Sequence, residues 1–344
     1  MAVTDSAAAS RRQSLGRWLR VIVSAVLLAV LVAKIHPEDL LPERRHFSTL
    51  AFLAAGVVIT GLGIVLSAWR WQRVLDVFDV RVPLRTLTKH YFAGQFVGNV
   101  LPSTIGGDVV RVSRGATTTG SGSVAFASVV LERLSGFIAL PLLVFIGFLL
   151  RPSLLDNNHA WIALAIAFGT LVLLVLILVV AGHPKLAGRF AEHENWMRFV
   201  GAVHVGIDRL RRQPRDAFGV LGAAVVYQLS VVAALYCAVQ ALDISIPNAA
   251  VIAFIPAVAM GQVVPLSVSG FGVREGLLVL LLHPLGVSTS SAVALGLFWY
   301  GMLLIVSLLG APAFAVGHRH DSSSSADDGQ PMDADTTTSA PTTS

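Results

Sequence analysis

Two arginines, each preceded by a proline and a glycine, are the residues of this sequence with the clearest chemical potential. The segment 98–111 aligns without a gap with 261–274, and the shared pattern is G-[NQ]-V-x-P-x-[ST]-[IV]-x-G-x-x-V-R. Chance matching among apolar residues does not place Pro, Gly and Arg in register together, so we interpret the two segments as an internal repeat. The repeated arginines are Arg111 and Arg274. A guanidinium group binds phosphate oxygens through two parallel hydrogen bonds, so the repeat is a candidate anion site.

The other positions of the repeat predict a broken helix. Pro102 and Pro265 end a helix because proline lacks the N–H group and clashes with the preceding turn, and Gly107 and Gly270 permit the unusual backbone angles that follow. Non-helical backbone at membrane depth is tolerated only where it is buried in protein or lines a watery cavity. We therefore expect each break to face a polar space. The helix that begins after each glycine would direct its free N–H groups and its arginine towards a phosphate group.

Charged residues near the repeat are candidates for balancing or gating the charge of a bound anion. Glu132 and Arg133 lie inside an apolar segment, where ionisable groups are costly and usually pair within the bundle. We expect Glu132 to pair with Arg111 or Arg274, or to carry a proton; the alternative is an adjacent charge pair at a helix end. Asp108 is three residues before Arg111, a spacing that suits either capping of the new helix or orientation of that arginine.

Glu275 completes this charged set. It follows Arg274 directly, and neighbouring residues on a helix do not face each other, so we expect that the two are not partners and that Glu275 points towards a different helix. Arg70 and Arg73 alternate with tryptophans, which fits an aromatic and basic belt at the membrane interface. For the repeat itself, the alternative interpretation is that Pro and Gly only mark ordinary loops between helices and that the two arginines anchor helix ends at the membrane interface.

The elements that must position these residues are helices in a membrane. Hydrophobic residues make up 55% of the chain and charged residues only 13%, which is too apolar for one soluble core, so lipid must be part of the solvent. Lys and Arg concentrate in 1–20, 69–89 and 182–216, which places both termini in the cytoplasm. The expected spans, in alternating directions, are 18–34, 49–68, 123–150, 160–181, 217–242 and 289–316.

Two further apolar stretches, 86–111 and 248–283, contain the repeat motifs and are expected to be re-entrant hairpins or broken helices. An odd number of spans separates the motifs, which inverts the second copy relative to the first. The predicted fold class is therefore all-α: a polytopic membrane helix bundle of about six to eight spans, with two re-entrant or broken-helix segments that form an inverted repeat. The segment 276–316 is one span, or two spans joined by a turn at Pro284 and Gly286.

The rest of the chain divides around this membrane domain. We predict a basic cytoplasmic tail at 1–17, the membrane domain at 18–317 and a disordered polar tail at 318–344. The basic segment 182–216 either lies on anionic headgroups or forms a solvated loop. Cys237 is the single cysteine, and the sequence has no zinc-type Cys/His spacing and no nucleotide-binding loop. We therefore expect no metal, no cofactor and no nucleic acid partner.

Several segments together carry a family resemblance: 69–71, 98–102, 106–111, 132–136, Pro265 and 270–275. They resemble the membrane region of lysylphosphatidylglycerol synthases and their stand-alone, flippase-like relatives, over about 18–317. In the aminoacyl-lipid synthases this region is similar to a flippase that moves the modified lipid outward, and a separate soluble domain makes the aminoacyl ester. Only a short polar tail follows residue 317 here, so the resemblance implies no synthase activity. Where the family motif more often has Asp-Arg, this chain has Glu132 and Arg133.

The resulting prediction is an integral membrane lipid translocase in the plasma (inner) membrane that moves an anionic phospholipid or a lipid-linked headgroup. The candidate headgroup ligands are Arg111, Arg274, Asn99, Gln262, Gly107 and Gly270. The candidates for gating or balancing charge are Asp108, Glu132, Arg133 and Glu275, and the helix breaks are Pro102 and Pro265.

Two other functions compete with translocation. One is a membrane transferase acting on a polyprenyl phosphate or a lipid-linked sugar, and the other is a non-transporting scaffold. The predicted external loops 35–48, 151–159 and 243–247 are short, which favours transport over catalysis. The predicted partner is the membrane lipid substrate, and a homo-oligomer and a separate lipid-modifying enzyme stay open as further partners.

Overall fold

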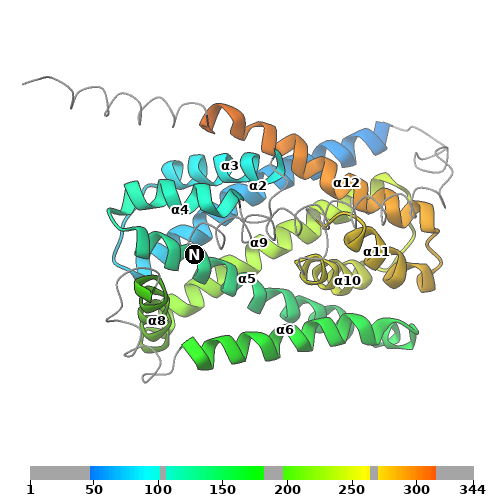
Figure 1. The fold of residues 1–344 in the computed structure, drawn as a ribbon. Coiled ribbons are helices and arrows are strands. Elements are labelled where there is room, and N and C mark those ends of the chain that lie inside the picture. Colours follow the sequence, from blue (N-terminus) through cyan, green and yellow to red (C-terminus); the bar gives the residue numbers. More distant parts are fainter. Residues whose placement is uncertain (1–46, 101–105, 182–196, 264–269, 315–344) are drawn as a thin grey trace, which may run out of the picture.

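The computed structural model describes residues 47–100, 106–181, 197–263 and 270–314. Within these ranges the chain is helical and has no strand (Figure 1). The α-helices are α2 (Phe47–Val77), α3 (Leu84–Val100), α4 (Gly106–Thr119), α5 (Gly122–Leu150), α6 (Ala160–Ala181), α8 (Met197–Arg212), α9 (Pro214–Ala241), α10 (Asn248–Gly261), α11 (Val273–Leu282) and α12 (Thr289–Leu308). Two short 3-10 helices, η2 (Pro152–Asp156) and η4 (His283–Leu285), lie in connections.

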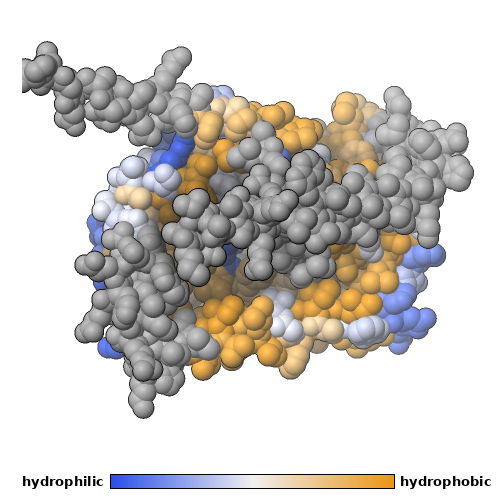
Figure 2. All heavy atoms as spheres, in the orientation of Figure 1, coloured by the Kyte–Doolittle hydropathy of each residue, from blue (hydrophilic) through white to orange (hydrophobic). Residues whose placement is uncertain are grey.

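Five of these helices, α2, α5, α6, α9 and α12, are long and apolar enough to cross a membrane. They correspond to five of the six predicted spans, and the sixth, 18–34, lies outside the described residues. In Figure 1 the five helices run broadly along one direction. Figure 2 shows hydrophobic residues across the middle of the molecule and hydrophilic residues towards the two ends of these helices. The prediction of an all-α, multi-pass membrane bundle is confirmed.

Helix α6 illustrates why lipid must surround the bundle. Its exposed side is almost entirely large and apolar, which would be unfavourable in water but suits contact with acyl chains. The exposed hydrophobic residues of this helix are Trp161, Phe168, Val172, Leu173, Val175, Leu176, Ile177 and Val179.

Two helix pairs, α3 with α4 and α10 with α11, occupy the apolar stretches that contain the repeat motifs. The members of each pair pack against each other, and the two pairs lie towards opposite ends of the long helices (Figure 1). Pro102 and Pro265, the predicted breaks, lie outside the described residues. The inverted relation between the two pairs stays a prediction.

The ambiguity at 276–316 is resolved by helix length. Helix α11 has 10 residues, about 15 Å at ~1.5 Å per residue, which is half of a bilayer core. It ends at η4, and Gly286 has a φ of 88° that only glycine adopts without strain. This region therefore contributes one full span, α12, and one short helix.

Helix α8 crosses the ends of the long helices (Figure 1). Ile207 is buried, and Val203 and Leu210 pack beside it against α2 and α5. Arg209 Nη1 donates to the carbonyl oxygen of Val77 at 2.9 Å and pairs with Asp79 at 2.7 Å. Part of the apolar side of α8 is therefore covered by α2 and α5.

Residues just beyond α12 are fixed to the α3–α4 pair. Arg114 of α4 donates from its two terminal nitrogens to the carbonyl oxygens of Ala313 and Phe314, both at 2.9 Å. A Cβ atom on Gly310 would lie only 2.1 Å from the carbonyl oxygen of Phe92 in α3, so glycine is needed for this approach. The residues that follow α12 are thus held against α3 and α4.

Candidate functional site

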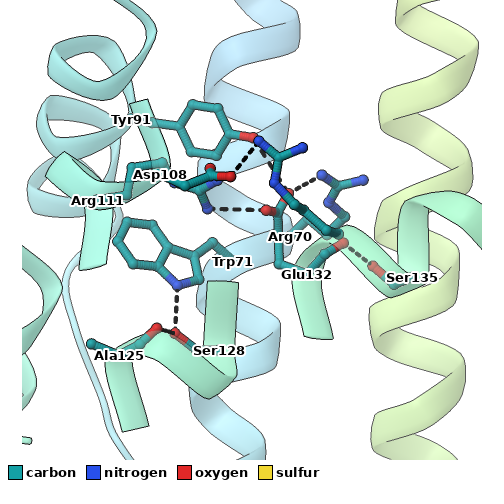
Figure 3. Close-up of polar contacts among 10 residues, drawn as sticks. Arg70, Trp71, Tyr91, Asp108, Arg111, Ala125, Ser128, Glu132 and Ser135 are labelled. Carbon is teal, nitrogen blue, oxygen red and sulfur yellow. Dashed lines mark hydrogen bonds and ion pairs between the residues drawn. The ribbon is translucent and has the colours of Figure 1, made fainter. Parts of the chain in front are cut away.

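A carboxylate held by two arginines forms the centre of a buried cluster (Figure 3). Glu132 of α5 is fully buried, and its two oxygens accept from different helices. Arg111 Nη2 of α4 donates to Oε2 at 3.0 Å, and Arg70 Nη2 of α2 donates to Oε1. Both arginines are at most 4% exposed. Of the two partners that the sequence suggested for Glu132, the structure has Arg111, and it adds Arg70.

A second, more accessible carboxylate extends the cluster. Asp108 pairs with Arg111 through Oδ1 at 3.3 Å and with Arg133 through Oδ2 at 2.5 Å. The side chain of Arg133 is 50% exposed and that of Asp108 is 20% exposed. Three guanidinium groups thus face two carboxylates, so the cluster carries one excess positive charge.

Aromatic rings enclose the guanidinium groups. Arg111 lies over the rings of Tyr91 at 4.0 Å and Trp71 at 4.6 Å, and Arg70 lies over Tyr227 at 4.7 Å. Such cation–π contacts strengthen when water is excluded. Because these side chains come from α2, α3, α4, α5 and α9, the cluster ties five helices together.

The interpretation of Arg70 as an interfacial residue is wrong. Helix α2 continues to Val77 and its Arg70 side faces α5 and α9, so the residue lies inside the bundle. The adjacent Trp71 is also fully buried, and its Nε1 donates to Ser128 at 2.8 Å. Arg73, by contrast, is exposed and lies over Trp69 at 5.5 Å. Arg70 and Glu132 are far apart in the sequence and share no motif, so the sequence analysis did not predict that they pair.

The two repeat glycines, Gly107 and Gly270, have different structural roles. Gly270 has a φ of 77°, as the prediction of an unusual backbone conformation requires. Gly107 lies inside α4 with no positive φ, so the same prediction is wrong there. A Cβ atom on Gly107 would lie 2.6 Å from the carbonyl oxygen of Gly94, so its role is close packing of α4 on α3. Helix α4 begins before Gly107, which places Arg111 in its second turn.

The second repeat forms its own, separate pair. Glu275 Oε2 accepts from the backbone N–H of Gly272 at 2.7 Å, and its Oε1 accepts from Arg274 Nε and Nη2 at 3.0 and 2.5 Å. The rings of Phe271, Tyr300 and Trp299 lie 5.5, 5.5 and 5.9 Å from this guanidinium group.

The expectation that Arg274 and Glu275 would not be partners is wrong. Both belong to the first turn of α11, where side chains lean towards the start of the helix and no preceding turn separates them. The long arginine side chain folds back to the carboxylate that caps the helix. Arg274 is therefore neutralised locally, and its side chain is 2% exposed.

A cavity of about 310 Å³, lined by both polar and apolar residues, lies between the Glu132 cluster and the Arg274–Glu275 pair. Its walls come from the middle portions of four spans, α2, α5, α9 and α12, and from α3 and the end of α10. The polar residues that line it are Thr60, Ser67, Tyr91, Gln95, Arg133, Tyr227, Gln228, Ser230, Gln262 and Trp299. Arg133 is the charged member of this lining.

Neither repeated arginine lines the cavity. Tyr91 separates Arg111 from it, and Trp299 lies between it and Arg274, since each ring contacts its arginine and also lines the cavity. Gln262 is the predicted headgroup ligand that does line the cavity. Asn99 has a buried Nδ2 atom with no partner within the described part of the chain. Binding of phosphate by Arg111 and Arg274 stays a prediction.

No grouping of three or more His, Cys, Asp or Glu side chains suitable for a metal ion occurs among the described residues. Asp108, Glu132 and Glu275 are each paired with arginine.

The fold and this site define a class: a polytopic membrane protein whose spans line a cavity that contains polar side chains and lies beside a buried ion cluster. The chain belongs to the family described as the lysylphosphatidylglycerol synthase TM region, whose model matches residues 17–310. It is also similar to a UPF0104 membrane protein of Pyrococcus horikoshii, with 25% identity over 180 residues, 51% of this chain and 52% of that protein. The chain thus spans about half the length of this curated relative. The family resemblance seen in the motifs is confirmed.

Proposed function

We propose that this protein moves an anionic membrane lipid across the plasma (inner) membrane, with the polar headgroup passing through the central cavity while the acyl chains stay in lipid. The observation that carries this proposal is the position of the cavity. Four membrane spans contribute residues from near their midpoints to its wall, and seven of these side chains carry polar groups. Polar and charged side chains at this depth are costly unless they serve a polar solute.

Arg133 is the group in this proposal that receives the lipid phosphate. It lines the cavity, is half exposed and is held by Asp108 rather than by the fully buried Glu132. A phosphate offers more oxygens than a carboxylate and can replace Asp108 at Arg133 by bidentate bonding. Asp108 keeps a second partner, Arg111, when it is displaced. The exchange therefore leaves no charge unpaired.

The buried cluster acts as the frame for this exchange. Arg70 and Arg111 share Glu132 and fix α2, α4 and α5 relative to one another, so the position of Arg133 on α5 is set within a rigid unit. The pair of Arg274 and Glu275 holds the start of α11 on the other side of the cavity. Alternating access would then require the α10–α11 pair to move relative to this rigid unit.

A transferase acting on a polyprenyl phosphate or lipid-linked sugar is the weaker candidate. Such an enzyme needs a carboxylate or histidine near the acceptor to move a proton. Among the described residues that line the cavity there is no Asp, Glu or His. The lining suits binding better than acid–base chemistry.

The test is reconstitution in liposomes with lipids labelled on an acyl chain and an impermeant quencher. Wild type should expose inner-leaflet anionic lipid to the quencher, and Arg133→Gln should slow this about tenfold, equivalent to ~1.4 kcal/mol. Arg73→Gln is the matched control, because Arg73 is exposed and does not line the cavity. Movement at the wild-type rate by Arg133→Gln would refute the role of Arg133. No movement of any anionic lipid by wild type would refute translocation.

A further inference from the structure

The cavity lining also carries information on which headgroup it accepts. We propose that its substrate is a phosphate ester whose remaining headgroup is uncharged and rich in hydroxyl groups, such as glycerol or a sugar, and that headgroups bearing an amine are rejected. This inference rests on the proposed function and specifies its substrate class. It departs from what the family description would suggest, because a lysyl headgroup is cationic.

The distribution of charge around the cavity argues for rejection of amines. Among the described residues that line it, Arg133 is the charged one, and its charge is positive. The nearby carboxylates, Asp108 and Glu132, are each held by two arginines, and the whole cluster keeps an excess of one positive charge. An ammonium group in the cavity would therefore meet like charge, and no carboxylate occurs among the described residues that line it. Asp108, when the phosphate displaces it from Arg133, still pairs with Arg111. A single phosphate charge is complementary to the same surroundings.

Three glutamine side chains argue for hydroxyl groups as the partners. Gln95 of α3, Gln228 of α9 and Gln262 after α10 line the cavity from three elements. No hydrogen bond of these three side chains is found within the described part of the chain. Each amide presents two donor hydrogens and one acceptor oxygen, which complement the mixed donor and acceptor character of a polyol. An apolar or purely anionic ligand would leave these groups unsatisfied, at a cost to binding.

Two hydroxyl groups add acceptors to this lining. Thr60 and Ser230 each donate their hydrogen to a carbonyl of their own helix, at 2.7 Å to Gly56 and 2.6 Å to Tyr227. Their oxygen lone pairs remain available to accept from a ligand hydroxyl. The lining thus offers donors and acceptors on several walls, as recognition of several hydroxyl groups requires.

The size of the cavity limits what enters it. A volume of about 310 Å³ is at the lower end of ligand sites, which suits a headgroup and excludes a complete lipid with its acyl chains. We therefore expect the glycerol phosphate or sugar phosphate to enter the cavity, whether the lipid anchor is diacylglycerol or polyprenol.

The experiment compares headgroups on identical labelled acyl chains in liposomes that contain the full chain. Phosphatidylglycerol should move at least ~tenfold faster than phosphatidylethanolamine and lysylphosphatidylglycerol. A polyprenyl phosphate sugar forms a separate arm that distinguishes the two anchors. Equal or faster movement of the amine-bearing lipids would overturn the headgroup inference while leaving translocation intact.

Variants of the glutamines test the same point without relying on the wild-type preference. Gln228→Glu and Gln262→Glu keep the side-chain shape and place a carboxylate in the cavity, so the preference should shift towards amine-bearing lipids at least several-fold. Gln213→Glu, an exposed position at the start of α9, is the matched control and should leave the preference unchanged. An unchanged preference in both cavity variants would overturn the assignment of this lining to the headgroup.

Binding provides a readout that does not require transport. The purified full chain in neutral detergent should gain thermal stability from added phosphatidylglycerol and less from phosphatidylethanolamine. If neither lipid moves in liposomes but this selective stabilisation persists, translocation fails and the headgroup inference stands. If both lipids stabilise the chain equally, the headgroup inference fails.

Discussion

Glu132 offers a test of the buried cluster that is independent of any transport assay. Glu132→Gln keeps the size of the side chain but removes the negative charge between Arg70 and Arg111. One guanidinium group then loses its charged acceptor, and the new amide NH₂ group points a donor at a donor. The two arginines also remain close together and like-charged.

The magnitude follows from the burial of these groups. Two opposite charges ~4 Å apart at an effective dielectric constant of ~20 attract each other by about 4 kcal/mol. The cost of burying the charges offsets part of this energy, and in the variant the buried arginines still bear their share of that cost. Removing one partner of a buried pair costs about 3–5 kcal/mol in measured cases. Because Glu132 is fully buried, we expect a loss of this size in the free energy of unfolding.

Unfolding by sodium dodecyl sulfate in mixed micelles, followed by circular dichroism, measures this loss. The double variant Glu132→Gln with Arg70→Gln should be less destabilised than the sum of the single variants by at least ~1 kcal/mol, because it no longer leaves the Arg70 cation unpaired, while Arg111 keeps Asp108. Asp208→Asn breaks an exposed pair with Arg212 and serves as the control, with an expected change below ~0.5 kcal/mol. A loss below ~0.5 kcal/mol for Glu132→Gln, or strict additivity, would refute the reasoning.

Further predictions concern three glycines. Gly107→Ala should destabilise by about 1–3 kcal/mol, because the added methyl group meets the backbone carbonyl of Gly94 and the α3–α4 pair must separate. Gly169→Ala, in an open position of α6, is its control and should be neutral or slightly stabilising in the same detergent unfolding assay. Gly270→Ala should cost about 1–2 kcal/mol, since the positive φ strains any residue with a Cβ atom; an unchanged midpoint would contradict the observed backbone conformation.

The sequence predicted the spans well because hydropathy over about 20 residues is a local property. It also predicted that Glu132 is buried and paired, since an ionisable residue in an apolar helix has few other solutions. Arg70 was missed because its environment depends on which side of α2 faces α5 and α9, and the flanking tryptophans are equally typical of a membrane interface.

Other errors arose where a long side chain or a close backbone contact overrides a spacing rule. The rule that adjacent helical residues do not interact holds inside a helix, but Arg274 and Glu275 stand in its first turn. For Gly107 the repeat suggested a conformational role, and only the packed position of α3 revealed a steric one. The separation of Arg111 and Arg274 by Tyr91, Trp299 and the cavity depends on tertiary packing that the motif does not encode.

The two hydrogen bonds from Arg114 to the carbonyls of Ala313 and Phe314 bear on how the protein is handled at the bench. Affinity tags and fluorescent fusions are commonly joined to the carboxyl end of a membrane protein on the assumption that this end is inert. In this chain, strain applied just after residue 314 would be transmitted through one guanidinium group to the helix that carries Asp108 and Arg111. A carboxyl-terminal fusion is therefore best joined beyond the predicted polar tail 318–344, and not directly after residue 314.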